Sequence, residues 1–147
     1  MKGKRVEPTF AGRLIVWGIA ALAIVANVLG YQARLYDQWW WFDRVLHGAT
    51  LFALTLWLGV IFFSTELQPE YARGLRTFLL LLGFGIAIGA LWEVAEWGLE
   101  NYTVANLIKG KNDTILDIIM DSFGAAAAAA LTPFLLQSVT KRSGRVL

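Results

Sequence analysis

The stretch NDTILDIIMDSFG, residues 112–124, is the part of the chain on which its fold and its chemistry both depend. Asp113, Asp117 and Asp121 recur within it at intervals of four residues. At about 3.6 residues per turn, this spacing places them on one face of a helix. Like charges so spaced repel one another in water and are still less favourable in a membrane. The stripe therefore requires compensation by a cation, by basic partners or by protonation.

The composition around this stretch is typical of a membrane protein. The chain has 147 residues, 57% of them hydrophobic, and a mean hydropathy of +0.55. It is more apolar than a soluble domain of this size, which predicts a single multi-span membrane domain. The absence of cysteine excludes disulfides, thiolate metal sites and thiol catalysis. The net charge is only +2, and we interpret the basic residues as topology signals rather than as a nucleic-acid surface.

Four apolar stretches are long enough to cross the hydrocarbon core. We predict an all-α bundle of four transmembrane helices, at about residues 14–31, 43–63, 77–98 and 113–136, with basic tails at 1–13 and 137–147. The triplet at 21–23 has the pattern of a signal-peptide cleavage site, but it lies inside the first stretch, which we therefore expect to be retained. Gly85 and Gly89 predict close helix packing, as does Asn27 in the first span. Pro133 is expected to bend or end the last helix.

The distribution of basic residues predicts how the bundle is oriented. Four spans place both termini on one side, where the tails and the second loop carry most of the basic residues. The positive-inside rule then makes both termini cytoplasmic. The aromatic run at 39–42 is of a kind found at membrane interfaces. The ionisable residues of the last three spans all fall in the outer part of the membrane: Asp43, His47, Glu93, Glu96, Glu100, Asp113, Asp117 and Asp121.

If these three helices adjoin, the ionisable residues form an acidic pocket that is open to the outside. A charge at the centre of a transmembrane helix costs about 2.5–3.5 kcal/mol on insertion scales, and less near an interface. Charges at one depth on three separate spans are therefore hard to explain by chance. We predict a divalent-metal site with Asp113, Asp117, Asp121, Glu93 and Glu96 as ligands, and with Asp43, Arg44 and His47 as the residues that complete it or perform chemistry.

The residue types limit the metal without identifying it. Carboxylates suit Mg²⁺, Mn²⁺ or Ca²⁺, and one imidazole shifts the preference toward Mn²⁺, Fe²⁺ or Zn²⁺. A metal would cancel the repulsion in the stripe and could activate a water molecule. The Glu-x-x-Glu pattern at 93–96 lacks the histidine of the usual di-iron motif. A structural zinc is disfavoured by the single histidine and the lack of cysteine.

Two interpretations without a metal stay open. In one, Arg44 holds an anion while His47 and a carboxylate exchange protons. In the other, Arg44 and His47 simply pair with acids across the helices. Asp113 also has a purely local interpretation as the N-cap of the last helix. We assign Glu100 and Asp37 to solvated loops.

The sequence DRVLH at 43–47 resembles the Asp-Lys/Arg-x-x-His motif of the VanZ-like and YjdF-like bacterial membrane proteins. The sequences LWEVAEW at 91–97 and DTILDIIMDSFG at 113–124 are more similar to the YjdF-like pattern, because VanZ-like chains usually have Glu-x-x-Gln in the first and Asn at the position of Asp121 in the second. The resemblance covers residues 43–124. It implies a small multi-span inner-membrane protein. The association of VanZ-like members with tolerance to a lipoglycopeptide antibiotic points to the cell envelope, without establishing a reaction.

Our leading interpretation is a divalent-metal site that acts on or recognises an envelope lipid or another phosphate-bearing ligand. Membrane lipids are the expected partners, and nucleic acid is not. The alternative is a non-catalytic subunit of a larger membrane complex or homo-oligomer, with its small and aromatic residues facing helices, lipids or pigments. Cation or proton transport is less favoured, because no comparable set of ionisable residues continues through the cytoplasmic half. Whether the protein is an enzyme stays open.

Overall fold

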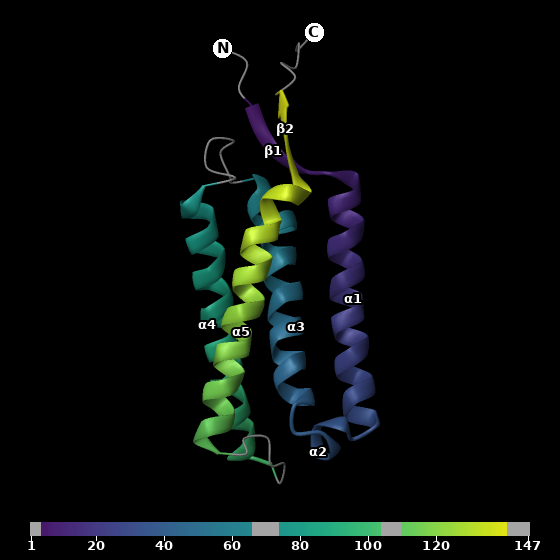
Figure 1. Ribbon diagram of the computed structural model, residues 1–147, viewed down its shortest axis with the longest axis vertical. Coiled ribbons are helices and arrows are strands. Elements are labelled where there is room, and N and C mark those ends of the chain that lie inside the picture. The colour runs from purple at the N-terminus through teal and green to yellow at the C-terminus, as the bar shows by residue number, and fades with distance from the viewer. Residues whose placement is uncertain (1–3, 66–73, 104–109, 141–147) are drawn as a thin grey trace.

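Four long helices make up most of the described chain. The computed structural model describes residues 4–65, 74–103 and 110–140, and its long helices run roughly side by side (Figure 1). They are α1 (Phe10–Gln32), α3 (Phe42–Trp57), α4 (Leu75–Glu100) and α5 (Lys111–Leu131). A short helix, α2 (Leu35–Gln38), lies between α1 and α3. The predicted all-α bundle of four helices that are long and apolar enough to cross a membrane is confirmed.

Each long helix begins before its predicted span, and two of them change their winding near the end that holds the termini. α3 continues as a π-helical turn, η1 (Leu58–Phe62), and then a 3₁₀ turn, η2 (Phe63–Thr65). α5 stops at Leu131 and is followed by a 3₁₀ turn, η3 (Thr132–Leu135). Pro133 accounts for that change, because it has no N–H with which to continue the α-helical hydrogen bonds. The predicted end of the last helix at residue 136 is therefore too late.

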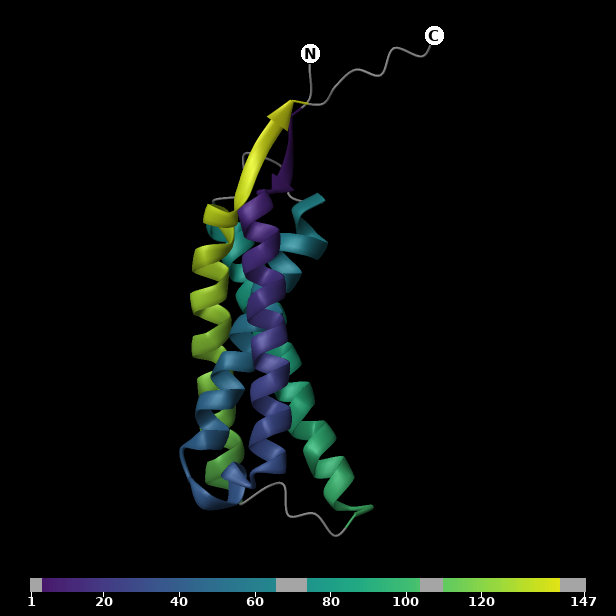
Figure 2. The ribbon, with the colours of Figure 1, turned by 90° about the vertical axis from the view of Figure 1, so that its right-hand side faces the viewer.

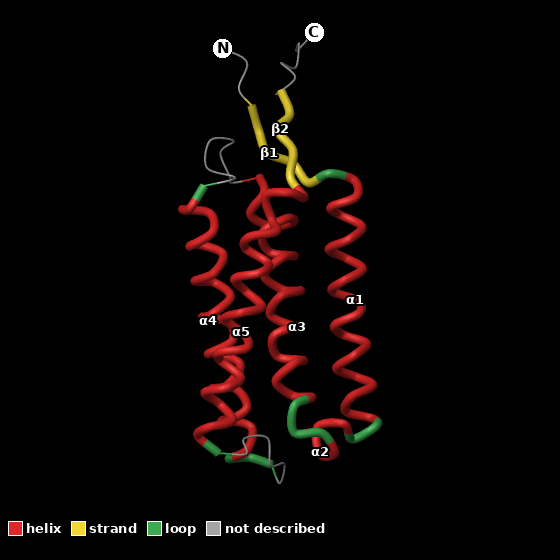
Figure 3. Tube along the Cα trace, viewed as in Figure 1, coloured by secondary structure: helices red, strands yellow, loops and turns green. Residues whose placement is uncertain are grey.

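A two-stranded sheet at the same end was not predicted. β1 (Lys4–Pro8) pairs antiparallel with β2 (Leu136–Thr140), in a register that runs from Lys4 opposite Thr140 to Pro8 opposite Leu136 (Figure 3). Val6 and Leu136 are both buried, 2% and 6% exposed. The parts of the basic tails nearest the bundle are thus ordered, because each carries an apolar side chain that the bundle covers. The tail beyond residue 140 and the loop residues 66–73, including Arg73, lie outside the described residues.

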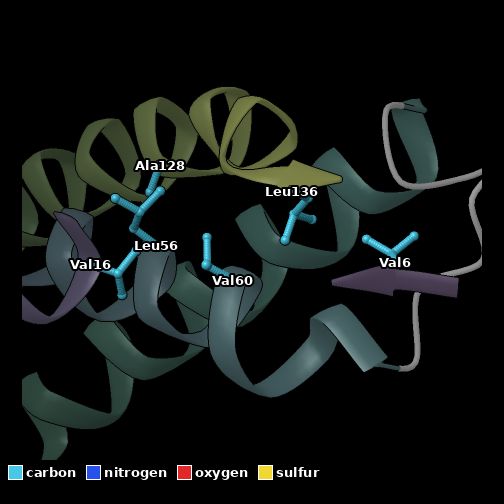
Figure 4. Packing of buried hydrophobic residues seen from close by; sticks show 6 residues of the cluster. All are labelled: Val6, Val16, Leu56, Val60, Ala128 and Leu136. Atoms are coloured by element: carbon cyan, nitrogen blue, oxygen red, sulfur yellow. The ribbon is translucent and has the colours of Figure 1, made fainter. Parts of the chain in front are cut away.

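The buried apolar residues gather in the half of the bundle near the termini. Their cluster consists of small and medium aliphatic side chains from α1, α3, η1, α5 and the two strands (Figure 4): Val6, Val16, Leu56, Val60, Ala128 and Leu136. Large apolar residues such as Leu22, Trp17 and Leu91 are instead more than half exposed on the outside of the bundle. So extensive an apolar surface is what a lipid-facing bundle presents.

The remaining packing depends on close approach of three helices. α5 packs against both α3 and α4, while α1 packs mainly against α3 and lies in front of the others in Figure 2. A Cβ atom at Gly124 of α5 would collide with the carbonyl oxygen of Gly48 in α3. The predicted packing at Gly85 and Gly89 is confirmed, since a Cβ atom at either would collide with α5. The backbones of α3 and α5 are therefore in contact at Gly124, while at Gly85 and Gly89 the backbone of α4 lies against side chains of α5.

We expect Gly124→Ala to destabilise the protein by about 1–3 kcal/mol, the usual range for overpacking, because the added methyl group must separate α3 from α5. Unfolding in mild detergent with increasing sodium dodecyl sulfate measures the change. Gly83→Ala in α4 is the matched control, since a Cβ atom there meets no other atom within 4 Å. Equal stability of the two variants would contradict the close-packing interpretation.

Candidate functional site

The ionisable residues of the last three spans come together at the end of the bundle opposite the termini. There α3 begins, α4 ends and α5 begins, all at the lower end of Figure 1. Asp43, Arg44 and His47 come from α3, Glu93 and Glu96 from α4, and the three aspartates of the stripe from α5. Chain order alone placed these side chains at one depth. The structure adds that they are neighbours.

The aspartate stripe is buried along its length. Asp113, Asp117 and Asp121 are 5%, 3% and 0% exposed, and the face of α5 that carries them is turned toward α3 and α4. Asp121 is the most buried of the three aspartates, and Gly89 makes room for it. A Cβ atom on Gly89 would collide with the Asp121 carboxylate. The glycine spacing in α4 and the aspartate spacing in α5 are therefore parts of one arrangement, in which a carboxylate lies directly against a helix backbone.

His47 lies among carboxylates on both sides of its ring. Its Nδ1 is 3.3 Å from Asp121 Oδ1 and 3.8 Å from Glu93 Oε1, while its Nε2 is 3.7 Å from Asp43 Oδ1. The imidazole is 9% exposed. The chain's only histidine thus contacts acids from all three helices, which is a position suited to binding a cation or to moving a proton.

Arg44 is paired with the first aspartate of the stripe. Its Nη2 donates to Asp113 Oδ1 at 2.7 Å, its Nη1 donates to the Trp40 carbonyl, and its guanidinium lies 5.6 Å from the centre of the Trp40 ring. The structure therefore realises the cross-helix pairing that was one of the interpretations left open. The interpretation of Asp113 as an N-cap is wrong, because α5 begins at Lys111 with Gly110 in the N-cap position. Asp113 lies in the first turn, where the helix dipole favours a negative charge.

Several carboxylate oxygens in the site accept no hydrogen bond from the described protein. They are Glu93 Oε1, Asp117 Oδ1 and both oxygens of Asp121, and all four are inaccessible to solvent. Buried polar groups in folded proteins are nearly always hydrogen-bonded, and a buried unpaired charge is far more unfavourable than a neutral group. Glu93 Oε1 and Asp121 Oδ1 face the His47 ring, and Asp121 Oδ2 lies against the backbone of α4 at Gly89.

Two sets of residues have the geometry to hold a cation. His47, Glu93 and Glu96 form one set, and Asp43, Asp113 and Asp117 form the other. Within each set, one potential ligand atom per residue lies within 4.8 Å of the others. Asp121 belongs to neither triplet but is adjacent to His47. All eight residues predicted for the site thus lie in or beside these two sets. Asp37 and Glu100 belong to neither set, but the prediction that both lie in loops is wrong, because Asp37 is exposed within α2 and Glu100 is the half-buried last residue of α4.

Sequence patterns gave no indication of a polar network beside the site. Tyr36 of α2 donates to Asn27 Oδ1 at 3.1 Å, and Asn27 donates in turn to Thr50 Oγ1 at 3.0 Å. Burial, together with the charges of Asp43 and Glu96, raises the pKa of Tyr36 to about 12. Asn27 attracts notice as a polar residue in an apolar span, but Tyr36 is a single loop aromatic without a motif. Trp92 of α4 also donates to Glu96 Oε1 at 2.8 Å.

Comparisons with known proteins identify a family but no reaction. A family model described as a predicted membrane protein, DUF2238, matches residues 5–138. The chain is also similar to an uncharacterised protein of Thermotoga maritima, with 26% identity over 114 residues, which make up 77% of this chain and 58% of that protein. The chain therefore spans less than two thirds of the relative's length. No solved structure gives a significant match.

Replacing Arg44 alone should destabilise the protein more than replacing both Arg44 and Asp113. We expect Arg44→Met to lower the free energy of unfolding by about 3 kcal/mol, because it leaves Asp113 buried without its cation, and Arg44→Met/Asp113→Asn to recover much of that loss. Unfolding in detergent measures both. Lys111→Met, an exposed basic residue of the same end, should have little effect. A double variant that is less stable than Arg44→Met would show that the pair is not the main role of Arg44.

Proposed function

The chain belongs to the DUF2238 family of predicted membrane proteins, and from that premise we propose that its acidic site binds a divalent metal ion. The observation that carries the proposal is the set of buried carboxylate oxygens without hydrogen bonds on Glu93, Asp117 and Asp121, gathered around one imidazole. A divalent cation satisfies these oxygens and cancels the repulsion between them at the same time. A proton shared between two carboxyl groups satisfies one oxygen of each, whereas a divalent ion can accept several of these oxygens and the imidazole nitrogen together.

The ligand chemistry supports a hard or borderline ion. Carboxylates favour Mg²⁺ or Mn²⁺, and His47 adds affinity for Mn²⁺, Fe²⁺ or Zn²⁺. In this proposal Asp117, Asp121, Glu93 and Glu96 are ligands, and Asp113 contributes while paired with Arg44. Asp43 and His47 complete the site or exchange protons with the bound ligand. The metal, when bound, supplies a Lewis acid and lowers the pKa of a bound water molecule.

We take the ligand of this site to be the phosphate-bearing headgroup of an envelope lipid. Five exposed tryptophans border the acidic end of the bundle, at the depth where such rings contact headgroups: Trp39, Trp40, Trp41, Trp92 and Trp97. Arg44 is the cation suited to a phosphate. A phosphate would have to compete with Asp113 for it, so anion binding and the Arg44–Asp113 pair are alternatives. Orientation by the positive-inside rule would make this the outer face of a bacterial inner membrane.

Kinship with the YjdF-like and VanZ-like proteins belongs to the same proposal. Its support is the order and spacing of the motifs at 43–47, 91–97 and 113–124, which contain the residues that meet in the site. An envelope role agrees with this kinship. The competing function, a non-catalytic subunit of a larger membrane complex, predicts a protein partner that stays bound through purification and no dependence on metal.

Elemental analysis of the full chain purified in mild detergent tests the metal site. We expect bound divalent ion in the wild type, and its loss in Asp117→Asn/Asp121→Asn, because both substitutions keep the side-chain volume but remove the charge and an oxygen ligand. Asp37→Asn, at an exposed position, is the control and should retain the metal. A wild type that carries no more metal than the double variant after equilibration with Mn²⁺, Zn²⁺ or Mg²⁺ would contradict the proposal and direct attention to a protein partner.

A further inference from the structure

We infer that the site holds two cations in two chemically different positions, an inference that rests on the proposed metal binding and goes beyond it. The first position, the imidazole set, consists of His47, Glu93 and Glu96. The second, the aspartate set, consists of Asp43, Asp113 and Asp117. The two sets share no residue, and they draw on different helix pairs: α3 with α4 for the imidazole set, and α3 with α5 for the aspartate set.

The distances favour two ions over one. Protein ligands bind divalent cations at about 2.0–2.6 Å, so ligand atoms on opposite sides of one ion lie no more than about 5 Å apart. Each set meets that limit, with its ligand atoms within 4.8 Å of one another. The six residues satisfy this distance limit as two groups of three and not as one group of six. A single ion would therefore leave one triplet of carboxylate-rich donors without a cation.

His47 separates the two positions. Its Nδ1 faces Glu93 Oε1 at 3.8 Å, on the side of the imidazole set, and its Nε2 faces Asp43 Oδ1 at 3.7 Å, on the side of the aspartate set. Asp121 Oδ1, 3.3 Å from Nδ1, lies beside the imidazole set and is its natural fourth ligand. The ring thus has Glu93 and Asp121 at one nitrogen and Asp43 at the other.

Each set also contains an unsatisfied buried oxygen, which is independent of the clustering of acids. In the imidazole set this is Glu93 Oε1, on a residue that is 5% exposed, and in the aspartate set it is Asp117 Oδ1, on a residue that is 3% exposed. Arg44 supplies one positive charge to the aspartate set, through Asp113. That pair engages Asp113 and leaves Asp117 Oδ1 without a hydrogen bond, so it does not satisfy the whole set.

The donor types predict different metal preferences. The imidazole set combines nitrogen with oxygen and suits Mn²⁺, Fe²⁺ or Zn²⁺, whereas the aspartate set offers only oxygen and suits Mg²⁺, Ca²⁺ or Mn²⁺. Mn²⁺ is accepted by both and is therefore the appropriate probe. Two neighbouring cations also suit a phosphate group, whose oxygens can contact both ions, which agrees with the proposed class of ligand.

The test is the Mn²⁺ stoichiometry of the full chain in mild detergent, measured by equilibrium dialysis and elemental analysis. We expect two Mn²⁺ per chain in the wild type and in Asp37→Asn, one in Glu93→Gln, one in Asp117→Asn and none in the variant with both substitutions. Glu93→Gln should lose Zn²⁺ binding and Asp117→Asn should lose Mg²⁺ binding. If either variant fails to purify as a folded monodisperse species, Glu96→Gln or Asp43→Asn replaces it within the same set.

Electron paramagnetic resonance of the fully loaded wild type gives a readout that needs no variant. Neighbouring Mn²⁺ ions should give a spin-coupled spectrum, and the simple hyperfine spectrum of isolated Mn²⁺ at full loading would overturn the inference. One Mn²⁺ per chain, lost in both single variants, would also overturn it while leaving the proposed metal site intact. A wild type that binds no Mn²⁺, Zn²⁺ or Mg²⁺ would overturn the proposed function together with the inference.

Discussion

Asp113, Asp117 and Asp121 lie buried along one face of α5, and the repulsion among these carboxylates is the constraint that the surrounding helices must accommodate. Two basic or titratable side chains lie against these carboxylates: Arg44 pairs with Asp113, and His47 lies beside Asp121. Those contacts bring one basic or titratable side chain to each end of the stripe. Asp117, between them, keeps an oxygen without a hydrogen bond. Both oxygens of Asp121 also accept no hydrogen bond, so the unsatisfied oxygens lie from the middle of the stripe to its deep end.

The apolar packing and the ionisable residues lie in different halves of the bundle. Aliphatic residues fill the half near the termini, where Leu56 and Val60 meet Ala128, and the acids occupy the other half. Glycines connect the halves, because Gly124 and Gly89 let the three helices approach closely on either side of Asp121. A buried carboxylate cluster weakens a fold, and close backbone packing above it offsets that weakness. The same packing holds the ligand positions at fixed separations, as a site with several ligands requires.

Much of this could be predicted from the sequence, because it depends on periodicity and length. Apolar stretches long enough to span a bilayer give the four helices, and the four-residue interval of the aspartates gives their common face. What could not be predicted depends on neighbours that a pattern does not specify. From the sequence, Arg44 and His47 could have formed ion pairs or taken part in catalysis. The pairing of Arg44 with Asp113 becomes visible only when the position of α5 beside α3 is known. α5 begins at Lys111, directly after Gly110, which is earlier than the charge pattern indicated. Tyr36 donates to Asn27 of another helix, a contact with no local signature.

The pairing of β1 with β2 has a consequence for how α1 is held. β1 leads into α1 and β2 follows α5, so the pairing links two helices that otherwise touch each other little. Val6 and Leu136, both buried, anchor the two strands on the bundle. A change that loosens either strand would therefore loosen α1 and the end of α5 together.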